Sequence, residues 1–267
     1  FWFPFQRIPR FGLPSFCLLG YYTLVYIDII PLMGGFFLEK EIFAETVESE
    51  VTKNEEKLRK YLSLLSAANE LARLTGPSDE ETLWGSHLMD CASALPLLPH
   101  EGRIIDVGTG GGLPGIVWAI CRPGLNVTLL DSITRKCALV EKMAVAMGLR
   151  NVTVVCKRSE EYAKDEREKF HVAAARAVCA SGVLAEYLAP LVRTKGIALA
   201  FKGPKVTEEL ELVGNKWSAL GFSPPRLHPY MLGDIKRFFV IWDKVSQTPK
   251  GIPRRPGMAE KFPWYSR

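Results

Sequence analysis

Short runs of β-branched residues alternate with helical patterns from residue 101 to residue 245. The runs lie at 103–107, 126–131, 151–156, 171–175, 196–201 and 236–242, and helical patterns at 113–121, 134–147, 181–190 and 205–220 separate most of them. Apolar strands that alternate with helices predict an α/β fold, a doubly wound and mostly parallel sheet with helices on both faces. The last run follows Gly233-Asp234 with no helix before it, so we expect it to form a hairpin and to run antiparallel to its neighbour.

Residues 33–100 precede this pattern and predict an N-terminal helical lead-in. A first helix is expected over 36–74, because apolar residues recur there at helical spacing, at Leu58, Leu62, Leu65 and Leu71. Gly76-Pro77 ends it. The sequence Ser78-Asp79-Glu80-Glu81 then predicts a capping box, in which Ser78 caps a second helix that runs to about Leu95.

Residues 1–32 differ from the rest of the chain because they are rich in aromatic residues and proline. Their apolar run at 16–27 is shorter than the roughly 20 residues that a bilayer span requires. We therefore expect no stable membrane association. We interpret 1–32 as a non-native or disordered leader, translated from sequence upstream of a native start at Met33. An amphipathic membrane anchor is the alternative interpretation.

The composition is that of an ordinary globular protein, with 48% hydrophobic and 24% charged residues. It excludes a disordered chain, and six cysteines in 267 residues exclude a disulfide-dense mini-protein. The cysteines form no C-x-x-C pair and the four histidines are scattered. We therefore expect free thiols, a cytoplasmic location and no metal site.

The net charge of +5 is concentrated near the C-terminus. Residues 244–267 contain six basic residues and one acidic residue, which accounts for the whole excess. We accordingly divide the chain after the lead-in into a domain at 101–245 and a basic tail at 246–267. Such a tail favours a polyanionic partner, although charge alone is equally compatible with a solvated tail.

Four glycines within five residues follow the first predicted strand, in Gly108-Thr109-Gly110-Gly111-Gly112. Glycine lets the backbone turn sharply and lets a ligand approach it closely, so this loop predicts a ligand site. One interpretation is the dinucleotide fingerprint Gly110-x-Gly112-x-x-Gly115, with Asp131 as the acid that binds the ribose. The fingerprint fits poorly, because it begins three residues after the strand ends at Val107 and it contains Pro114.

The second interpretation is an acid-led loop, Asp106-Val107-Gly108-Thr109-Gly110, which resembles the first motif of S-adenosylmethionine-dependent methyltransferases. In that case the backbone at Gly108 and Gly110 contacts the cofactor. Asp106 orients the loop or accepts a hydrogen bond from the cofactor's ammonium group. Asp131 ends the next strand, where its carboxylate can accept hydrogen bonds from both ribose hydroxyls.

An ordered set of motifs extends this resemblance to about residues 55–263. The set comprises Leu74-Thr75, His87-x-x-Asp90, the loop at 106–115, Leu129-Leu130-Asp131-Ser132, Arg158-x-Glu160-Glu161, Ala175-Arg176-Ala177, Phe201-Lys202-Gly203 and the proline-rich end at 249–257. It is similar to that of the small-subunit ribosomal RNA methyltransferase G family, also called glucose-inhibited division protein B. The resemblance implies a seven-stranded Rossmann-like methyltransferase sheet, S-adenosylmethionine as cofactor, and methylation of N7 of one guanine in 16S ribosomal RNA.

The resemblance also implies roles for single residues. Gly108 and Leu113 line the cofactor pocket, and Ser159 and Glu160 flank the adenine. Arg176 lies at the mouth beside the methyl donor. Guanine N7 needs no general base to attack a methyl group, so we expect catalysis by alignment and charge, with Arg176, Lys202 and, more weakly, His87 as positioning residues.

The implied partner is 16S ribosomal RNA or the small ribosomal subunit, and we expect the protein to be a monomer. Basic side chains are expected to face RNA phosphates, and the candidates are Arg135, Lys136, Lys202, Arg237, Arg254 and Arg255. Two alternatives remain, a small-molecule methyltransferase or other cofactor enzyme and a catalytically inactive module that docks on ribosomal particles. Four positions depart from the family's usual residues, at Arg73, Ser86, Cys91 and Gly111.

Overall fold

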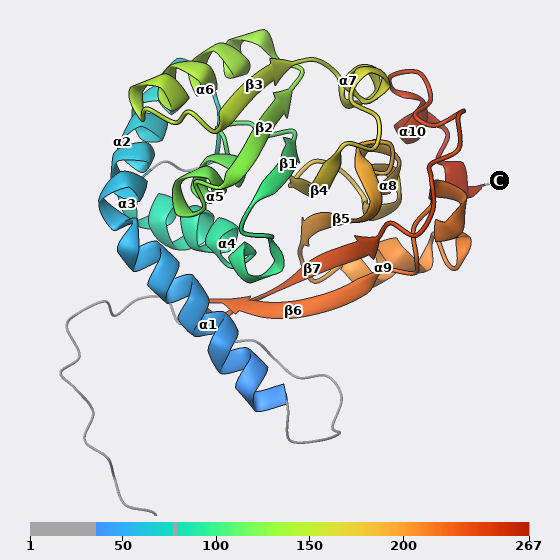
Figure 1. Cartoon of the computed structure of the whole chain (residues 1–267), viewed down its shortest axis with the longest axis horizontal. Helices are drawn as coiled ribbons and strands as arrows, with labels where there is room; N and C mark the ends of the chain where they lie inside the picture. The colour runs from blue at the N-terminus through green and yellow to red at the C-terminus, as the bar shows by residue number, and fades with distance from the viewer. Residues whose placement is uncertain (1–35, 77–78, 267) are drawn as a thin grey trace, which may run out of the picture.

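The computed structural model describes residues 36–76 and 79–266, so the interpretation of 1–32 as a leader, with its start at Met33, lies outside the described residues. One seven-stranded sheet organises the chain (Figure 1), with the strand order β3-β2-β1-β4-β5-β7-β6. Its strands are β1 (Gly102–Val107), β2 (Leu125–Asp131), β3 (Val152–Cys156), β4 (Phe170–Arg176), β5 (Val192–Lys202), β6 (Arg226–Leu232) and β7 (Ile235–Asp243).

Strands β1 to β5 pair in parallel, and β7 pairs antiparallel with both β5 and β6. The predicted doubly wound sheet and the antiparallel last strand are therefore confirmed. The β6 strand was not among the predicted runs, because Pro229 interrupts its pattern. A proline is tolerated there because β6 lies at the edge of the sheet, where one side of the strand makes no ladder hydrogen bonds.

The helices after β1 lie between successive strands, except for the last two, which follow β7. They are α5 (Gly115–Cys121), α6 (Thr134–Ala146), α7 (Ser159–Asp165), α8 (Ser181–Leu188), α9 (Val206–Glu211), the 3₁₀ turn η3 (Lys216–Leu220), α10 (Met258–Lys261) and η4 (Trp264–Ser266). The helix α7 was not predicted, because it is short, largely polar and without apolar periodicity. Its signal is the acid at the third helical position, where Glu161 accepts a hydrogen bond from the backbone N–H of Arg158 at 3.4 Å.

The N-terminal lead-in consists of α1 (Phe36–Lys53), α2 (Glu55–Leu71), α3 (Glu80–Thr82), the π-helical turn η1 (Leu83–Leu88), α4 (Met89–Ala92) and η2 (Leu95–Leu97). The prediction of one helix over 36–74 was wrong at two points. Asn54 leaves helical geometry and separates α1 from α2. The side chain of Asn69 accepts hydrogen bonds from the backbone N–H groups of Leu74 and Thr75, at 2.8 and 2.9 Å, and so ends the helical region early.

The predicted cap Ser78 lies outside the described residues. In the structure the helix begins at Glu80, and the preceding Asp79 caps it, because its carboxylate accepts a hydrogen bond from Thr82 N at 2.9 Å. The segment that continues into α4 carries His87 and Asp90 to the carboxyl edge of the sheet.

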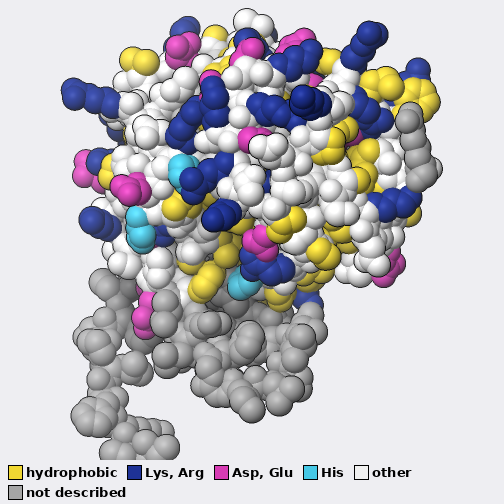
Figure 2. Space-filling model, turned by 45° about the vertical axis from the view of Figure 1, so that its right-hand side comes forward, with side chains coloured by type: hydrophobic (Ala, Val, Ile, Leu, Met, Phe, Trp, Pro, Cys, Tyr) yellow, Lys and Arg dark blue, Asp and Glu magenta, His cyan; other side chains and the backbone are white. Residues whose placement is uncertain are grey.

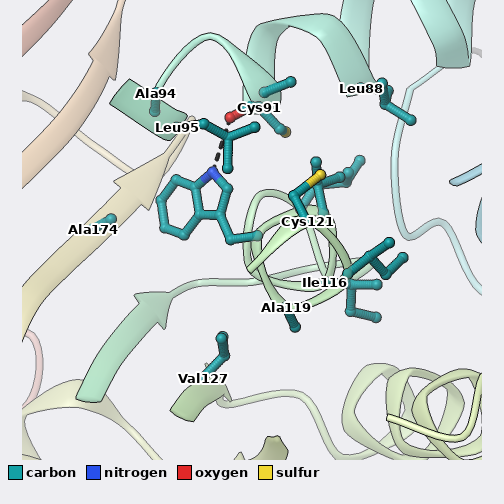
Figure 3. Close-up of a cluster of buried hydrophobic side chains, with 14 of the residues drawn as sticks. Leu88, Cys91, Ala94, Leu95, Ile116, Ala119, Cys121, Val127 and Ala174 are labelled. Carbon is teal, nitrogen blue, oxygen red and sulfur yellow. Dashed lines mark hydrogen bonds between the residues drawn. The ribbon is translucent and has the colours of Figure 1, made fainter. Parts of the chain in front are cut away.

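Two apolar clusters cover the two faces of the sheet. One joins the lead-in, α5 and α6 to one face, and the other joins α8, α9 and η3 to the opposite face. Trp118 of α5 is fully buried in the first cluster, and its indole N–H donates to the backbone oxygen of Cys91 at 2.9 Å (Figure 3). This bond joins α4 of the lead-in to α5, which packs on the sheet in the same cluster.

The C-terminal segment 246–266 packs on the domain. Thr248 is buried, and Trp264 donates its indole N–H to the backbone oxygen of Gly182 in α8 at 2.8 Å. Among the described residues, no helix combines the length and apolar character that crossing a membrane needs.

Candidate active site

The glycine loop 108–112 lies at the carboxyl end of β1, where the strand order reverses between β1 and β4. Doubly wound sheets bind ligands at this point. Gly108 has a φ of +74°, and a Cβ there would lie 2.7 Å from Cγ2 of Val178. The N–H groups of Gly108 and Thr109 both donate to the backbone oxygen of Leu130, at 2.8 and 3.1 Å. The loop is thus tied to β2 by its backbone.

Asp106 braces this loop from beneath. Its Oδ2 accepts hydrogen bonds from Thr109 Oγ1 at 2.7 Å and from Gly115 N at 3.0 Å. Burial raises the pKa of Asp106 to about 6, although these two hydrogen bonds act in the opposite direction. The other oxygen, Oδ1, is buried and has no hydrogen-bond partner among the described residues. The carboxyl group therefore carries an unused acceptor.

Asp131 ends β2 and supports the loop from the side. Its Oδ2 accepts a hydrogen bond from Gly110 N at 3.0 Å, and its Oδ1 accepts one from Ile133 N at 3.0 Å. These bonds hold the carboxylate in one orientation. Each oxygen can accept a further hydrogen bond, because a carboxylate has about four acceptor positions.

A cavity of about 760 Å³, here called the first cavity, opens beside the loop. The glycine loop forms one wall and the end of β4 forms another. The lead-in contributes 74–76, Ser86 and His87, and the turn between β6 and β7 contributes 232–235. Side chains far apart in the sequence thus meet around a single space.

Asp90 organises the charges at one wall of this cavity. It is fully buried, and its Oδ2 accepts hydrogen bonds from Arg176 at 3.2 Å and from Arg237 at 3.0 Å. Its Oδ1 accepts a hydrogen bond from Tyr230 Oη at 2.6 Å. Two guanidinium groups therefore share one carboxylate, which leaves the wall with a net positive charge.

His87 is held neutral in this arrangement. Arg176 Nη2 lies 3.2 Å from His87 Nδ1, and a guanidinium can only donate, so Nδ1 is the acceptor. The ring proton is then on Nε2, which lies 3.4 Å from Thr75 Oγ1. Burial and the charge of Arg176 both lower the pKa of His87. The imidazole orients Arg176 and has no free lone pair to act as a base.

Lys202 lies at the end of β5, outside the first cavity. Its Nζ donates to the backbone oxygen of Cys179 at 2.6 Å and to Glu209 at 2.8 Å. It lines a second cavity, of about 350 Å³, that also borders Arg176 and Arg237. The two arginines are therefore shared by both cavities.

Comparison with known families identifies this arrangement. The family model described as rRNA small subunit methyltransferase G matches residues 54–232. This chain belongs to the rRNA small subunit methyltransferase G family. The match includes the glycine loop and Arg176, which line the first cavity, and the buried Asp90 and Tyr230, which support its arginine wall from behind.

Curated relatives extend the match over most of the chain. A ribosomal RNA small subunit methyltransferase G from Carboxydothermus hydrogenoformans is 36% identical over 84% of this chain and 97% of its own length. The protein of the same name from Clostridium perfringens is 36% identical over 79% of this chain and 92% of its own length. A solved structure of an rRNA methylase from Streptococcus thermophilus is 15% identical, with a TM-score of 0.45 over 59% of this chain and 95% of that one.

The predicted family, the predicted fold and the predicted class of enzyme, an S-adenosylmethionine-dependent methyltransferase, are confirmed. Within this member of the rRNA small subunit methyltransferase G family, the structure brings several of the predicted site residues together around the first cavity. These are His87, Gly108, Gly110, Leu113, Lys136, Arg176 and Arg237.

Two predicted adenine contacts lie away from this cavity. Ser159 Oγ donates to the backbone oxygen of Tyr187 at 3.2 Å, and Glu160 accepts a hydrogen bond from Gly257 N at 3.2 Å. Both side chains are buried at the start of α7, which follows the strand next to β2. Their contact with an adenine stays a prediction.

The predicted RNA contacts have different surroundings in this methyltransferase. Arg135 donates to the backbone oxygen of Leu71, and Arg255 is exposed. Arg254 forms a two-point ion pair with Glu186, at 2.7 and 2.5 Å, and Glu186 is only 1% exposed. We therefore leave Arg254 out of the RNA contacts that we propose below.

Asp90, Tyr230 and the turn 232–235 belong to the site but were not predicted as site residues. Asp90 was visible as part of the His87-x-x-Asp90 motif. Tyr230 is 140 residues away along the chain, and nothing local in the sequence pairs it with Asp90.

The departures from the family's pattern fall in and around the site. Ser86 and Gly111 both line the first cavity, and Ser86 is exposed. At Gly111 a Cβ would lie 2.6 Å from Cδ1 of Leu65. Cys91 is buried, and its backbone oxygen, rather than its thiol, accepts the bond from Trp118. Arg73 is exposed.

Proposed function

We propose that this protein transfers the methyl group of S-adenosylmethionine to N7 of one guanine in 16S ribosomal RNA. The observation that carries the proposal is the first cavity itself. It lies between a glycine loop braced by Asp106 and a cationic wall formed by Arg176 and Arg237. The family relationship supports RNA of the small ribosomal subunit as the acceptor.

The residues present fit S-adenosylmethionine. The buried Oδ1 of Asp106 is an unused acceptor, Gly108 exposes its backbone, and Asp131 presents a fixed carboxylate beside the loop. An ammonium group and a ribose diol are the donors that such acceptors require. When bound, the cofactor supplies a methyl group on a positively charged sulfur.

Guanine N7 is the acceptor atom that best suits this site. Its lone pair is free at neutral pH, so methyl transfer to it needs no general base. The structure is compatible with such an acceptor, because His87 Nδ1 already accepts a hydrogen bond from Arg176. The residues of the site therefore act by alignment and by placing charge.

Arg176 is the residue that we propose positions the base. Two of its five N–H donors contact Asp90 and His87, and a donor that remains can hydrogen-bond guanine O6. Loss of Arg176 leaves Asp90 paired with Arg237 and Tyr230, so the fold should survive its removal.

Basic side chains are the proposed RNA contacts. Figure 2 shows Lys and Arg side chains spread over one face of the molecule, with acidic side chains among them. We propose that Lys136, which lines the first cavity, and the exposed Arg135, Lys205 and Arg255 face phosphates.

The test is transfer of labelled methyl groups to unmodified small ribosomal subunits. Arg176→Ala should lower kcat/KM by about 100-fold or more, because it removes a preorganised donor at the reacting base. Arg193→Ala is the matched control, since Arg193 is exposed at the amino end of β5, at the opposite edge of the sheet from the site, and should keep normal activity. Label that appears in a small molecule and not in RNA would contradict the proposed substrate.

A further inference from the structure

We propose that the second cavity receives the target guanine, unstacked from its RNA, while the first cavity holds the cofactor. This inference rests on the proposed function and adds a separate binding site for the base. It starts from the fact that the two cavities adjoin and share Arg176, Ala177 and Arg237.

The two cavities differ in what surrounds them. The first borders the glycine loop, the element that suits a cofactor. The second lies beyond it, at the ends of β4 and β5, and borders Val178, Lys202 and Gly203. Its volume of about 350 Å³ is at the small end of the range for ligand pockets, which suits one heterocyclic base.

Val178 separates the two spaces. It lines the second cavity and is 40% exposed, and its Cγ2 lies close enough to Gly108 to exclude a Cβ there. Ala177 next to it has a φ of +57°, a conformation that is strained for alanine and that turns the chain sharply after β4. A base in the second cavity would rest against the apolar Val178, with the cofactor loop directly behind that side chain.

The polar groups of the second cavity match the edge of guanine. Its charged side chains among the described residues are Arg176, Arg237 and Lys202, all of which donate hydrogen bonds. Lys202 uses two of its three donors on Cys179 and Glu209, which leaves one. Guanine presents O6 as an acceptor for one of these donors and keeps the N7 lone pair free for the methyl group, whereas adenine presents an amino donor in place of O6. Donors on the wall therefore favour guanine over adenine.

A base can enter this cavity only after it leaves its stack, because the cavity has room for one base and not for its stacked neighbours. Enzymes that modify bases commonly act on such extruded or single-stranded bases. The shared arginine wall then places O6 near Arg176 and turns N7 toward the first cavity.

Gly203 provides a clean way to fill the second cavity. A Cβ at Gly203 would meet no atom within 4 Å, and the residue has no left-handed φ, so Gly203→Val should fold normally while its side chain occupies the cavity. Gly251 has the same properties, is exposed and borders neither cavity, so Gly251→Val is the matched control.

The first measurement follows methyl transfer by the full chain to small ribosomal subunits. Gly203→Val should lower kcat/KM by about 100-fold or more, while its Kd for S-adenosylmethionine stays within about 2-fold of wild type. Gly251→Val should match wild type in both. Normal transfer by Gly203→Val would overturn the assignment, and so would loss of cofactor binding in that variant.

The second measurement does not depend on methyl transfer. The valine methyl groups are labelled for NMR, and guanosine monophosphate or adenosine monophosphate is added to protein saturated with S-adenosylhomocysteine. We expect guanosine monophosphate to shift the Val178 methyl signals more than adenosine monophosphate does, and Gly203→Val to abolish the effect. Equal shifts by both nucleotides, or none, would overturn the guanine site. Absence of methyl transfer by the wild-type protein would contradict the proposed function, while this titration still decides the base site.

Discussion

The buried carboxyl group of Asp106 stabilises the fold when it is protonated, whereas the cofactor requires it charged. Its carboxyl group is fully buried, and burial raises its pKa from 3.8 to about 6. The folded protein therefore binds this proton more tightly than the unfolded chain, so the stabilising contribution is complete below about pH 4 and is lost as the pH rises through 6. We infer that the charge is kept for the cofactor, since Oδ1 has no other partner among the described residues.

The variant Asp106→Asn tests the raised pKa of Asp106. It removes the titrating group, while its amide oxygen can still accept the hydrogen bonds from Thr109 and Gly115. Between pH 4 and pH 7, the free energy of unfolding of the wild type should fall by about 2 kcal/mol relative to that of the variant. Urea unfolding across this range measures it, and isothermal calorimetry should show weaker S-adenosylmethionine binding. A difference that does not change with pH would show that Asp106 is not a buried acid of raised pKa.

At the scale of elements, the C-terminal segment 246–266 stabilises the domain through Arg254. Glu186 of α8 is buried, and Arg254 contacts both of its oxygens. Arg254→Ala would leave this carboxylate buried without its partner, so we expect a loss of about 3–5 kcal/mol in the free energy of unfolding. Arg255→Ala removes the same charge from an exposed neighbour and should cost less than about 0.5 kcal/mol. Equal urea midpoints for the two variants would contradict the structural role of Arg254.

Local patterns predicted the elements and the part of the site that lies within short segments. The glycine loop could be predicted because a strand, the acid Asp106 and the glycines follow one another directly. The edge strand β6 has no predicted run of its own, because Pro229 breaks its pattern, and only the hairpin expected at Gly233-Asp234 implies it. The contact of Asp90 with Tyr230 and Arg237 is made by the tertiary fold, so no spacing in the sequence indicates it.

For the whole molecule, we expect binding to small ribosomal subunits to weaken steeply with salt, because basic side chains displace counterions from the RNA phosphates. Lys205→Ala and Arg255→Ala should each reduce the slope of log K against log salt concentration by about 1. Arg193→Ala, at the opposite edge of the sheet, should leave the slope unchanged. Filter binding to small ribosomal subunits between low and physiological salt measures these slopes, and equal slopes for all three variants would contradict the proposed RNA face.

The position of the transferred methyl group in 16S RNA shows whether guanine N7 is the acceptor. Small ribosomal subunits that lack the modification are incubated with the full chain and S-adenosylmethionine, and their 16S RNA is cleaved chemically at 7-methylguanine. We expect one new cleavage site, which is absent when Arg176→Ala replaces the wild-type enzyme. Methyl transfer to RNA without cleavage at any guanine would contradict N7 as the acceptor atom. It would also contradict the proposed hydrogen bond of Arg176 to guanine O6.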